Sequence, residues 1–279
     1  MRGRPRFVLV IAAIVPLALV LVGPQLLLLA LIRARVPGAR VAAGWLPVLF
    51  HRTLLSLAGI RVRRDGALAH RRPLLVAANH VSWLDIVVLG SLAPLSFVAK
   101  DEMRSWPVFG WLARLQRTVF IARDRRRTVS DQADRIADRL NEGAIVVLFP
   151  EGTTSDGHDL LPFKSALFEA ARFALVAGDL DEGAVQPVAL DYAAAAGMPL
   201  GRVGRARFAW PGEIGLGESL AATLDGTGLD VVVRCAEPIR LTPQSSRKVV
   251  SARAHAAIRT LLARAAPALR RLDTAPPQP

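Results

Sequence analysis

The sequence predicts an α/β domain with a mostly parallel sheet covered by helices, preceded by an N-terminal apolar helical segment associated with a membrane. Beyond residue 60, short apolar runs alternate with longer amphipathic ones, a pattern typical of strands in a helix-covered sheet. Before it, residues 7–32 carry no charge, and a helix of that length can cross a bilayer. We therefore expect a membrane-anchoring segment over 1–60, an α/β domain over 61–272 and a disordered proline-rich tail over 273–279.

The composition narrows the classes of partner. The chain has 279 residues and a formal net charge of +13, and a strong positive field favours nucleic acid, an anionic lipid surface or a phosphorylated substrate. Because the N-terminus is apolar rather than basic and disordered, we expect a lipid bilayer as partner and no nucleic acid. Cys235 is the only cysteine, which excludes an intrachain disulfide and a cysteine-based metal site.

The apolar segment 7–32 leaves two arrangements open. Pro16 and the Gly23-Pro24 pair interrupt it, and arginines flank both ends, so charge gives no clear orientation. One arrangement is a single spanning helix kinked at proline, which membrane helices tolerate. The other is a helical hairpin that dips into one leaflet. The next apolar stretch, 41–60, carries a basic residue in its middle and is predicted to lie at the interface or on the domain.

Apolar runs and helix signals place the elements of the α/β domain. Contiguous apolar residues predict buried strands over 74–78, 96–99, 118–122, 144–149, 185–190, 206–210 and 230–235. Amphipathic stretches predict helices over 83–92, 106–115, 129–141, 163–177 and 252–272. The third helix also has an acidic first turn and ends before Gly143. Sites in parallel sheets gather beyond the carboxyl ends of strands, so polar residues that follow a strand are the candidates.

The first candidate is the turn after the strand at 74–78. His80 and Asp85 are five positions apart and can meet if the chain between them turns into a helix. A carboxylate on one ring nitrogen fixes the tautomer of a histidine and supports the charge that the ring gains as a general base. The same residues also fit a capped helix start, with Ser82 as the cap and Asp85 three residues later.

Two further turns carry groups suited to an anion. Glu151-Gly152 follows a predicted strand and leads into the hydroxyls of Thr153-Thr154-Ser155, and backbone N–H groups with hydroxyls in such a turn suit a phosphate. Arg123 also follows a strand and could hold a phosphate in a forked geometry. An ordinary polar loop and a solvated arginine run fit the same patterns.

In chain order, these segments resemble the four blocks of the glycerolipid acyltransferase family, whose type member is 1-acyl-sn-glycerol-3-phosphate acyltransferase. The blocks are Asn79-His80-x4-Asp85, Phe120-Ile121-x-Arg123, Phe149-Pro150-Glu151-Gly152-Thr153 and Val185-x-Pro187-Val188. The similarity covers about residues 55–215. Residues 151–165 also resemble bacterial lyso-ornithine lipid acyltransferases of the same family.

The resemblance implies transfer of a fatty acyl group from acyl-CoA or acyl-carrier protein to a lysolipid hydroxyl, without a cofactor or a metal. It implies that His80 removes the hydroxyl proton while Asp85 holds the ring. It also implies a set of substrate-binding residues, in which Glu151 orients Arg123 or a hydroxyl rather than meeting a phosphate directly. The set comprises Asn79, Arg123, Glu151, Gly152, Thr153, Thr154 and Lys164.

Three residues depart from the family blocks and leave the acceptor open. Arg117 stands where glycine is common, Ala122 where aspartate is common, and Thr154 where arginine is common. The first expectation for the acceptor is 1-acylglycerol-3-phosphate, which becomes phosphatidic acid. The alternative is another lysolipid such as lyso-ornithine lipid. Substrate and product both reside in a bilayer, so we expect the protein at the inner membrane, with its active domain on the cytoplasmic side.

Two function classes outside the family are the alternatives, a serine hydrolase and a non-catalytic membrane-binding module. A serine hydrolase needs a Gly-x-Ser-x-Gly turn, and residues 152–157 have one residue too many for it. A non-catalytic membrane-binding module would not need His80 and Asp85 together. The run 156–159 offers acidic and histidine side chains, but its spacing fits no standard set of metal ligands.

Overall fold

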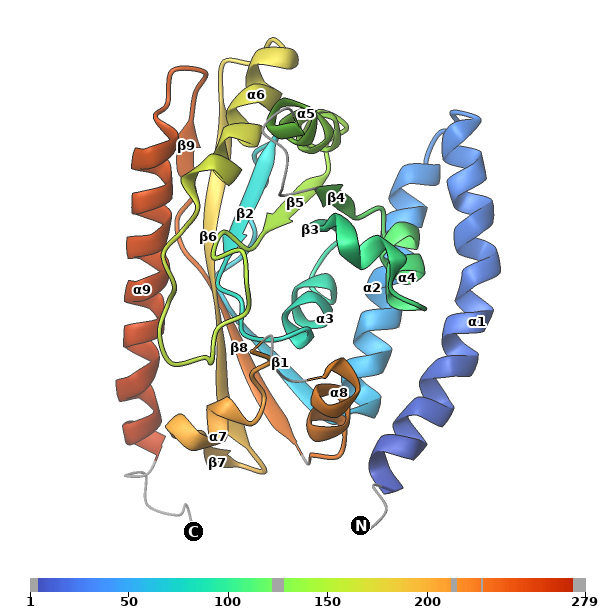
Figure 1. Ribbon diagram of the computed structural model, residues 1–279, viewed down its shortest axis with the longest axis vertical. Coiled ribbons are helices and arrows are strands. Elements are labelled where there is room, and N and C mark those ends of the chain that lie inside the picture. The colour runs from blue at the N-terminus through green and yellow to red at the C-terminus, as the bar shows by residue number, and fades with distance from the viewer. Residues whose placement is uncertain (1–4, 122–127, 212–214, 227, 273–279) are drawn as a thin grey trace.

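A sheet with helices on both faces forms the centre of the protein (Figure 1). The computed structural model describes residues 5–121, 128–211, 215–226 and 228–272. The predicted fold class, an α/β sheet preceded by an apolar helix, is confirmed. Ala122, Arg123 and the tail 273–279 lie outside the described residues.

The described elements follow one another along the chain with few long gaps. The helices are α1 (Pro5–Arg33), α2 (Ala39–Leu57), α3 (Leu84–Gly90), α4 (Phe109–Leu115), α5 (Thr128–Asn141), α6 (Glu169–Ala177), α7 (Arg202–Ala206), α8 (Leu216–Leu224) and α9 (Arg247–Leu272), with short 3-10 helices at Asp101–Ser105 and Ser165–Phe168. The strands are β1 (Ile60–Asp65), β2 (Leu74–Ala78), β3 (Leu95–Lys100), β4 (Val119–Ile121), β5 (Ile145–Leu148), β6 (Gly183–Ala195), β7 (Met198–Pro199), β8 (Leu229–Cys235) and β9 (Ile239–Leu241).

The sheet is mostly parallel, with β6 as the point where direction changes. Its main order is β1-β8-β6-β2-β5-β3-β4. Every neighbouring pair in this order is parallel except β6 and β8, and β7 and β9 also pair antiparallel with β6. Strands β1, β7 and β9 were not predicted from the sequence, because they lie in charged or short segments.

The strand predicted over 206–210 is wrong. Residue 206 ends α7, and 207–210 form a turn and an extended segment outside the sheet. Phe208 and Ala209, whose apolar side chains suggested a strand, are nevertheless buried in the core. The backbone of Trp210 donates to the carbonyl of Val81 at 2.9 Å, so this segment packs against the turn that carries His80.

Two hydrophobic cores lie on opposite faces of the sheet, and β2 contributes to both. Leu74 and Val76 pack in the core that contains α3 residues, whereas Leu75 and Ala77 pack in the core that contains α5, α6 and α9 residues. Successive side chains of a strand point to opposite faces. Because both faces are covered, the strand reads as a continuous apolar run, which is why the sequence predicted it.

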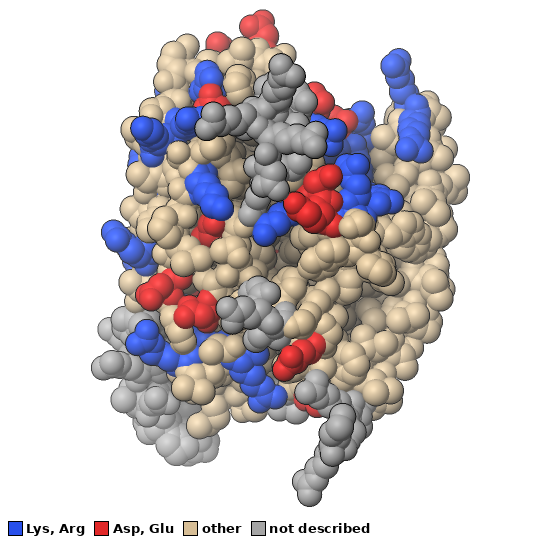
Figure 2. All heavy atoms as spheres, in the orientation of Figure 1, with Lys and Arg blue, Asp and Glu red and all other residues tan. Residues whose placement is uncertain are grey.

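The N-terminal apolar segment is one helix, α1, that continues through both Pro16 and Pro24. A hairpin within 7–32 is therefore not formed. By length and composition α1 could cross a membrane. Large apolar side chains are exposed along its length, from Val8 to Leu27, and Figure 2 shows this side of the molecule as a largely uncharged column with basic groups at one end.

α1 packs along α2 at the side of the α/β domain (Figure 1). The buried amide of Gln25 on α1 donates to the carbonyls of Ala43 and Leu115, at 3.1 and 2.8 Å. α2 in turn packs on α3, where His51 lies so close to Gly90 that an added Cβ would stand 2.1 Å from the ring. The second apolar stretch therefore packs on the domain, one of the two places predicted for it, and α3 lies between the helical pair and the sheet.

Candidate active site

His80 and Asp85 are in contact just beyond the carboxyl end of β2. The distance between His80 Nδ1 and Asp85 Oδ2 is 2.8 Å. Because a carboxylate only accepts, Nδ1 carries the proton of the neutral ring, and Nε2 is the nitrogen that can take a further proton. The side chain of His80 is 16% exposed and that of Asp85 is 0% exposed, so the ring, and not the carboxylate, is accessible to a substrate.

The carboxylate of Asp85 also bonds the backbone of the turn that precedes α3. Its Oδ2 accepts the backbone N–H groups of Val81 and Ser82 at 2.7 and 2.8 Å, and its Oδ1 accepts the hydroxyl of Tyr192 at 2.7 Å. α3 begins at Leu84, and its N-cap residue, Trp83, makes no side-chain capping hydrogen bond. The same carboxylate therefore holds both the turn before the helix and the imidazole.

Glu151 joins the loop after β5 to the turn that carries His80. Its Oε1 accepts the backbone N–H of His80 at 2.7 Å, and its Oε2 accepts that of Leu161 at 2.9 Å. The backbone N–H of Ser155 donates to the carbonyl of His80 at 2.8 Å. The predicted contact of Glu151 with Arg123 falls outside the described residues. Within them, Glu151 is a buried brace between two segments of the site.

Asn79 joins β2 to β6. Its Nδ2 donates to the carbonyl of Leu190 at 3.0 Å, and its Oδ1 accepts the N–H of the same residue at 2.7 Å. The side chain is 4% exposed. Both polar atoms of the Asn79 amide are hydrogen-bonded to Leu190 and hold the end of β2 against β6. Substrate binding by Asn79 stays a prediction.

The remaining predicted binding residues lie along the loop after β5. Thr153 is exposed, whereas the hydroxyl of Thr154 donates to the carbonyl of Trp210. Gly152 has a φ of 75°, and a Cβ there would stand 2.9 Å from Lys164 Nζ. The structure thus brings Lys164 over the Glu151-Gly152 turn and leaves Thr153 exposed. Substrate binding by these residues stays a prediction.

Arg117, one of the departures from the family blocks, lies in an ion cluster. Its guanidinium donates to Glu142 at 2.7 Å, and Arg139 also contacts both Glu142 and the carbonyl of Arg117. The φ of Arg117 is 60°, in the left-handed region that favours glycine. This explains why glycine is common at the position, and the arginine here is anchored by its ion pair.

Two residues of the site, Phe149 and Tyr192, had no role predicted from the sequence. Phe149 stacks on the ring of His80 with centroids 3.9 Å apart, and Tyr192 bonds Asp85 from β6. Phe149 directly precedes the Glu151 turn and could have been found there. For Tyr192 the available signal was the period of two along β6, which puts Leu190 and Tyr192 on one face.

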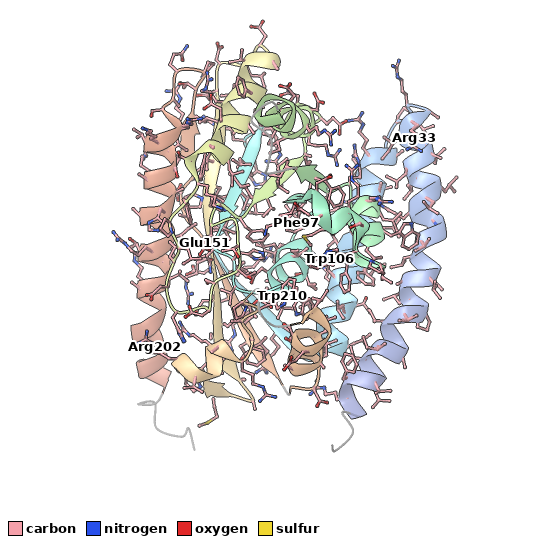
Figure 3. The ribbon with its side chains drawn as sticks, viewed as in Figure 1. Arg33, Phe97, Trp106, Glu151, Arg202 and Trp210 are labelled. Carbon is pink, nitrogen blue, oxygen red and sulfur yellow. The ribbon has the colours of Figure 1, made fainter. Side chains whose placement is uncertain are left out.

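Around this centre the site is lined by aromatic and apolar side chains. Trp106 and Trp210 meet edge to face with centroids 6.2 Å apart, and Figure 3 shows them, with Phe97, in the middle of the molecule beside α3. No group of three or more His, Cys, Asp or Glu side chains that could hold a metal ion occurs among the residues that the structure describes. The arrangement presents one imidazole, held by a buried carboxylate, to a substrate.

The comparison with known proteins decides the family. A family profile described as Acyltransferase matches residues 59–191, which contain His80, Asp85 and Glu151. The lyso-ornithine lipid O-acyltransferase of Brucella abortus (strain 2308) is 44% identical to this chain over 265 residues, which make up 94% of this chain and 96% of that protein. The chain belongs to the glycerolipid acyltransferase family.

Further matches fit this acyltransferase into the same family. The 1-acyl-sn-glycerol-3-phosphate acyltransferase of Neisseria gonorrhoeae is 45% identical over 135 residues, covering 48% of this chain and 49% of that protein. The crystal structure of the 1-acyl-sn-glycerophosphate acyltransferase from Thermotoga maritima matches with a TM-score of 0.62 and 20% identity over 99% of this chain and all of that one. The second match shows that the two share a fold. The protein is thus an acyltransferase that acts on lysolipids.

Glu151 gives this acyltransferase a pH-dependent stability. Burial raises the pKa of Glu151 from its ordinary value of 4.5 to about 7, although the N–H groups of His80 and Leu161 act in the opposite direction. The folded state therefore binds a proton that the unfolded state releases near pH 4.5. The resulting stabilisation is fully present below pH 4.5 and is lost as the pH rises through 7.

We predict that the free energy of unfolding of the wild type, relative to Glu151→Gln, falls by about 2–3 kcal/mol between about pH 5 and 8. Chemical denaturation at several pH values measures this difference, because glutamine does not titrate. Glu218→Gln, at an exposed position of α8, is the matched control and should leave the pH dependence of the wild type unchanged. A constant difference between wild type and Glu151→Gln across this range would contradict the prediction.

Proposed function

We propose that this acyltransferase moves a fatty acyl group from acyl-CoA or acyl-carrier protein to the hydroxyl of lyso-ornithine lipid. The observation that carries the proposal is the match, over nearly the whole of both chains, with a protein named for that acceptor. The relative named for 1-acylglycerol-3-phosphate matches over about half of each chain. These matches favour the alternative acceptor of the sequence analysis over 1-acylglycerol-3-phosphate, which was the first expectation.

The charges of the loop after β5 support a zwitterionic acceptor. An ornithine head group carries an ammonium and a carboxylate, whereas lysophosphatidate carries only a phosphate. Asp156 and Asp159 are exposed on this loop together with the cation Lys164, and Gly157 packs towards Val81 beside His80. A loop with both signs of charge is complementary to a head group with both signs. Figure 2 shows acidic and basic side chains around the middle of the face of the molecule that is turned to the viewer.

In the proposed reaction His80 is the general base. Nε2 takes the proton of the acceptor hydroxyl as its oxygen attacks the thioester carbonyl carbon, and Asp85 supports the imidazolium through Nδ1. The tetrahedral oxyanion then collapses, the C–S bond breaks, and the thiolate takes the proton from His80. The products are the acylated lipid and a free thiol, and no protein nucleophile is required because the thioester is already activated.

The apolar helix α1 supports the proposal that the reaction takes place at the surface of a bilayer. Its outward face is apolar along its length, and Arg33 and Arg35 stand at its carboxyl end. Arginines at the end of an apolar helix interact with lipid head groups. We propose that α1 anchors the enzyme in the inner membrane, with the α/β domain on the cytoplasmic side, where acyl donors are made.

A panel of acceptors tests the proposed function. Purified full-length protein in mixed micelles is given one acyl donor and, separately, lyso-ornithine lipid, lysophosphatidate or lysophosphatidylcholine, and the panel is repeated with the second donor class. We expect kcat/KM for lyso-ornithine lipid to exceed that for lysophosphatidate at least about 10-fold, the discrimination that one unpaired charged group can supply. A preference for lysophosphatidate would overturn the proposed acceptor. Thiol release that needs no acceptor would indicate a thioesterase instead.

A further inference from the structure

Tyr192 is the only tyrosine of the chain, and it lies inside the site. It comes from β6, 107 positions away from Asp85, and its hydroxyl donates to Asp85 Oδ1 at 2.7 Å. Its side chain is 3% exposed, so water does not compete for this hydrogen bond. None of the four sequence blocks that identify the family includes it.

The two oxygens of the Asp85 carboxylate have separate partners. Oδ2 receives three N–H groups, from His80 Nδ1 and from the backbone of Val81 and Ser82. Oδ1 receives the phenol of Tyr192. A fully buried carboxylate is stable only when its lone pairs are matched by donors. The phenol therefore supplies the hydrogen bond on the side of the carboxylate that faces away from the imidazole.

The surroundings of Tyr192 fix its hydroxyl as a donor to Asp85. Burial, and next the charge of Asp85, raise the pKa of Tyr192 well above its ordinary value, so the phenol keeps its proton. The hydroxyl of Ser82 acts on the pKa of Tyr192 in the opposite direction, but burial and the charge of Asp85 outweigh it. The aromatic ring stacks on Phe208 with centroids 6.4 Å apart, and the backbone of Leu190, two residues before Tyr192, is hydrogen-bonded to Asn79. The position of β6 is thus tied to the turn that carries His80.

We propose that Tyr192 is a positioning residue for acyl transfer. Its phenol holds the Asp85 carboxylate in the orientation that keeps Oδ2 on His80 Nδ1, and by drawing on the negative charge it sets how strongly Asp85 supports the imidazolium. The proposal rests on the proposed function, because it acts through the His80–Asp85 pair. It adds a third member to that pair, contributed by a strand remote in sequence.

Tyr192→Phe tests the proposal, since it removes one oxygen and keeps the ring. We expect kcat to fall about 10-fold, the effect of one hydrogen bond to a charged group, while KM for acceptor and donor changes less than about 2-fold because the phenol does not reach the substrate. Without the phenol, the charge of Asp85 is less dispersed and supports the imidazolium more strongly. The acidic limb of the pH profile of kcat/KM should therefore move to higher pH.

Phe208→Leu is the matched control. It removes the stacking partner of Tyr192 and lowers stability, but leaves the phenol in place, so the acidic limb should stay where it is in the wild type. A Tyr192→Phe enzyme with wild-type kcat and an unmoved limb would overturn the proposal, as would an equal shift in Phe208→Leu.

A spectroscopic measurement keeps the proposal testable even if Tyr192→Phe does not fold. Because Tyr192 is the only tyrosine, protein labelled with 3-fluorotyrosine gives one 19F resonance. We expect this resonance to shift in Asp85→Asn and to keep its position in His70→Ala, an exposed site. A resonance that keeps its position in Asp85→Asn would show that the phenol is not coupled to the carboxylate. This readout needs no substrate, so it is independent of the acceptor panel, and a wild type without transferase activity would contradict the proposed function alone.

Discussion

Replacing His80 with alanine is expected to lower kcat for acyl transfer about 10²–10⁴-fold, the range that a general base contributes. The ring is the only part of the His80–Asp85 pair that is accessible to a substrate. Without it, no group at this position can take the hydroxyl proton as the oxygen attacks the thioester. Acyl transfer from a radiolabelled donor to the preferred acceptor measures the loss.

The loss in His80→Ala should come from chemistry rather than from unfolding. His80 is partly exposed, and its backbone N–H and carbonyl, which Glu151 and Ser155 hold, remain in the variant. We therefore expect the thermal midpoint to change by only a few degrees. His70→Ala, in an exposed loop, is the matched control and should keep full activity. A His80→Ala enzyme that retained wild-type kcat would disprove the general-base mechanism.

Asp85→Asn is expected to give the second largest loss, about 10²–10³-fold in kcat. The side chain keeps its shape, but the amide carries no charge to support an imidazolium. The corresponding aspartate-to-asparagine change in the catalytic triad of a serine protease lowers kcat about 10⁴-fold. The loss here should be smaller, because acyl transfer from a thioester begins with an activated carbonyl.

The amide also disturbs the hydrogen bonds of the buried carboxylate. Asp85 accepts donors on both oxygens, whereas asparagine must turn an N–H₂ group towards one set of them. We expect a stability loss of about 1–3 kcal/mol, the cost of an unsatisfied buried donor. Kinetics and chemical denaturation on the same preparation separate the two effects. Asp138→Asn, at an exposed position of α5, should change neither, and an Asp85→Asn enzyme with wild-type kcat would rule out a role for the charge.

The site residues that could be predicted from the sequence are those in turns that follow a predicted strand. The turn at His80 and the turn at Glu151 each follow a contiguous apolar run, and the structure places both at the same end of β2 and β5, which pair in parallel. Contacts within one turn span few residues, so their geometry depends on local backbone conformation. This is why the contact between His80 and Asp85 could be inferred from the order of residues along the chain.

Roles that depend on contacts between distant segments could not be inferred. The hydrogen bonds of Glu151 with the backbone of His80 and Leu161 were not predicted, whereas the predicted contact with Arg123 lies outside the described residues. The apolar run at 206–210 suggested a strand, and it packs in the core as a turn and an extended segment instead. In each case the side chain or segment satisfies its bonding or burial requirement with a partner that only the fold supplies.

The α/β class, the apolar N-terminal helix and the contact between His80 and Asp85 could all be predicted from the sequence, because each is encoded in a local pattern of apolar and polar residues. Only the tertiary structure shows that α1 is one helix packed on α2, that strand direction changes at β6, and that Tyr192 bonds Asp85. These features depend on strand register and helix packing, which arise from many weak contacts between residues far apart in the chain. The third partner of the His80–Asp85 pair is therefore visible only in the folded protein.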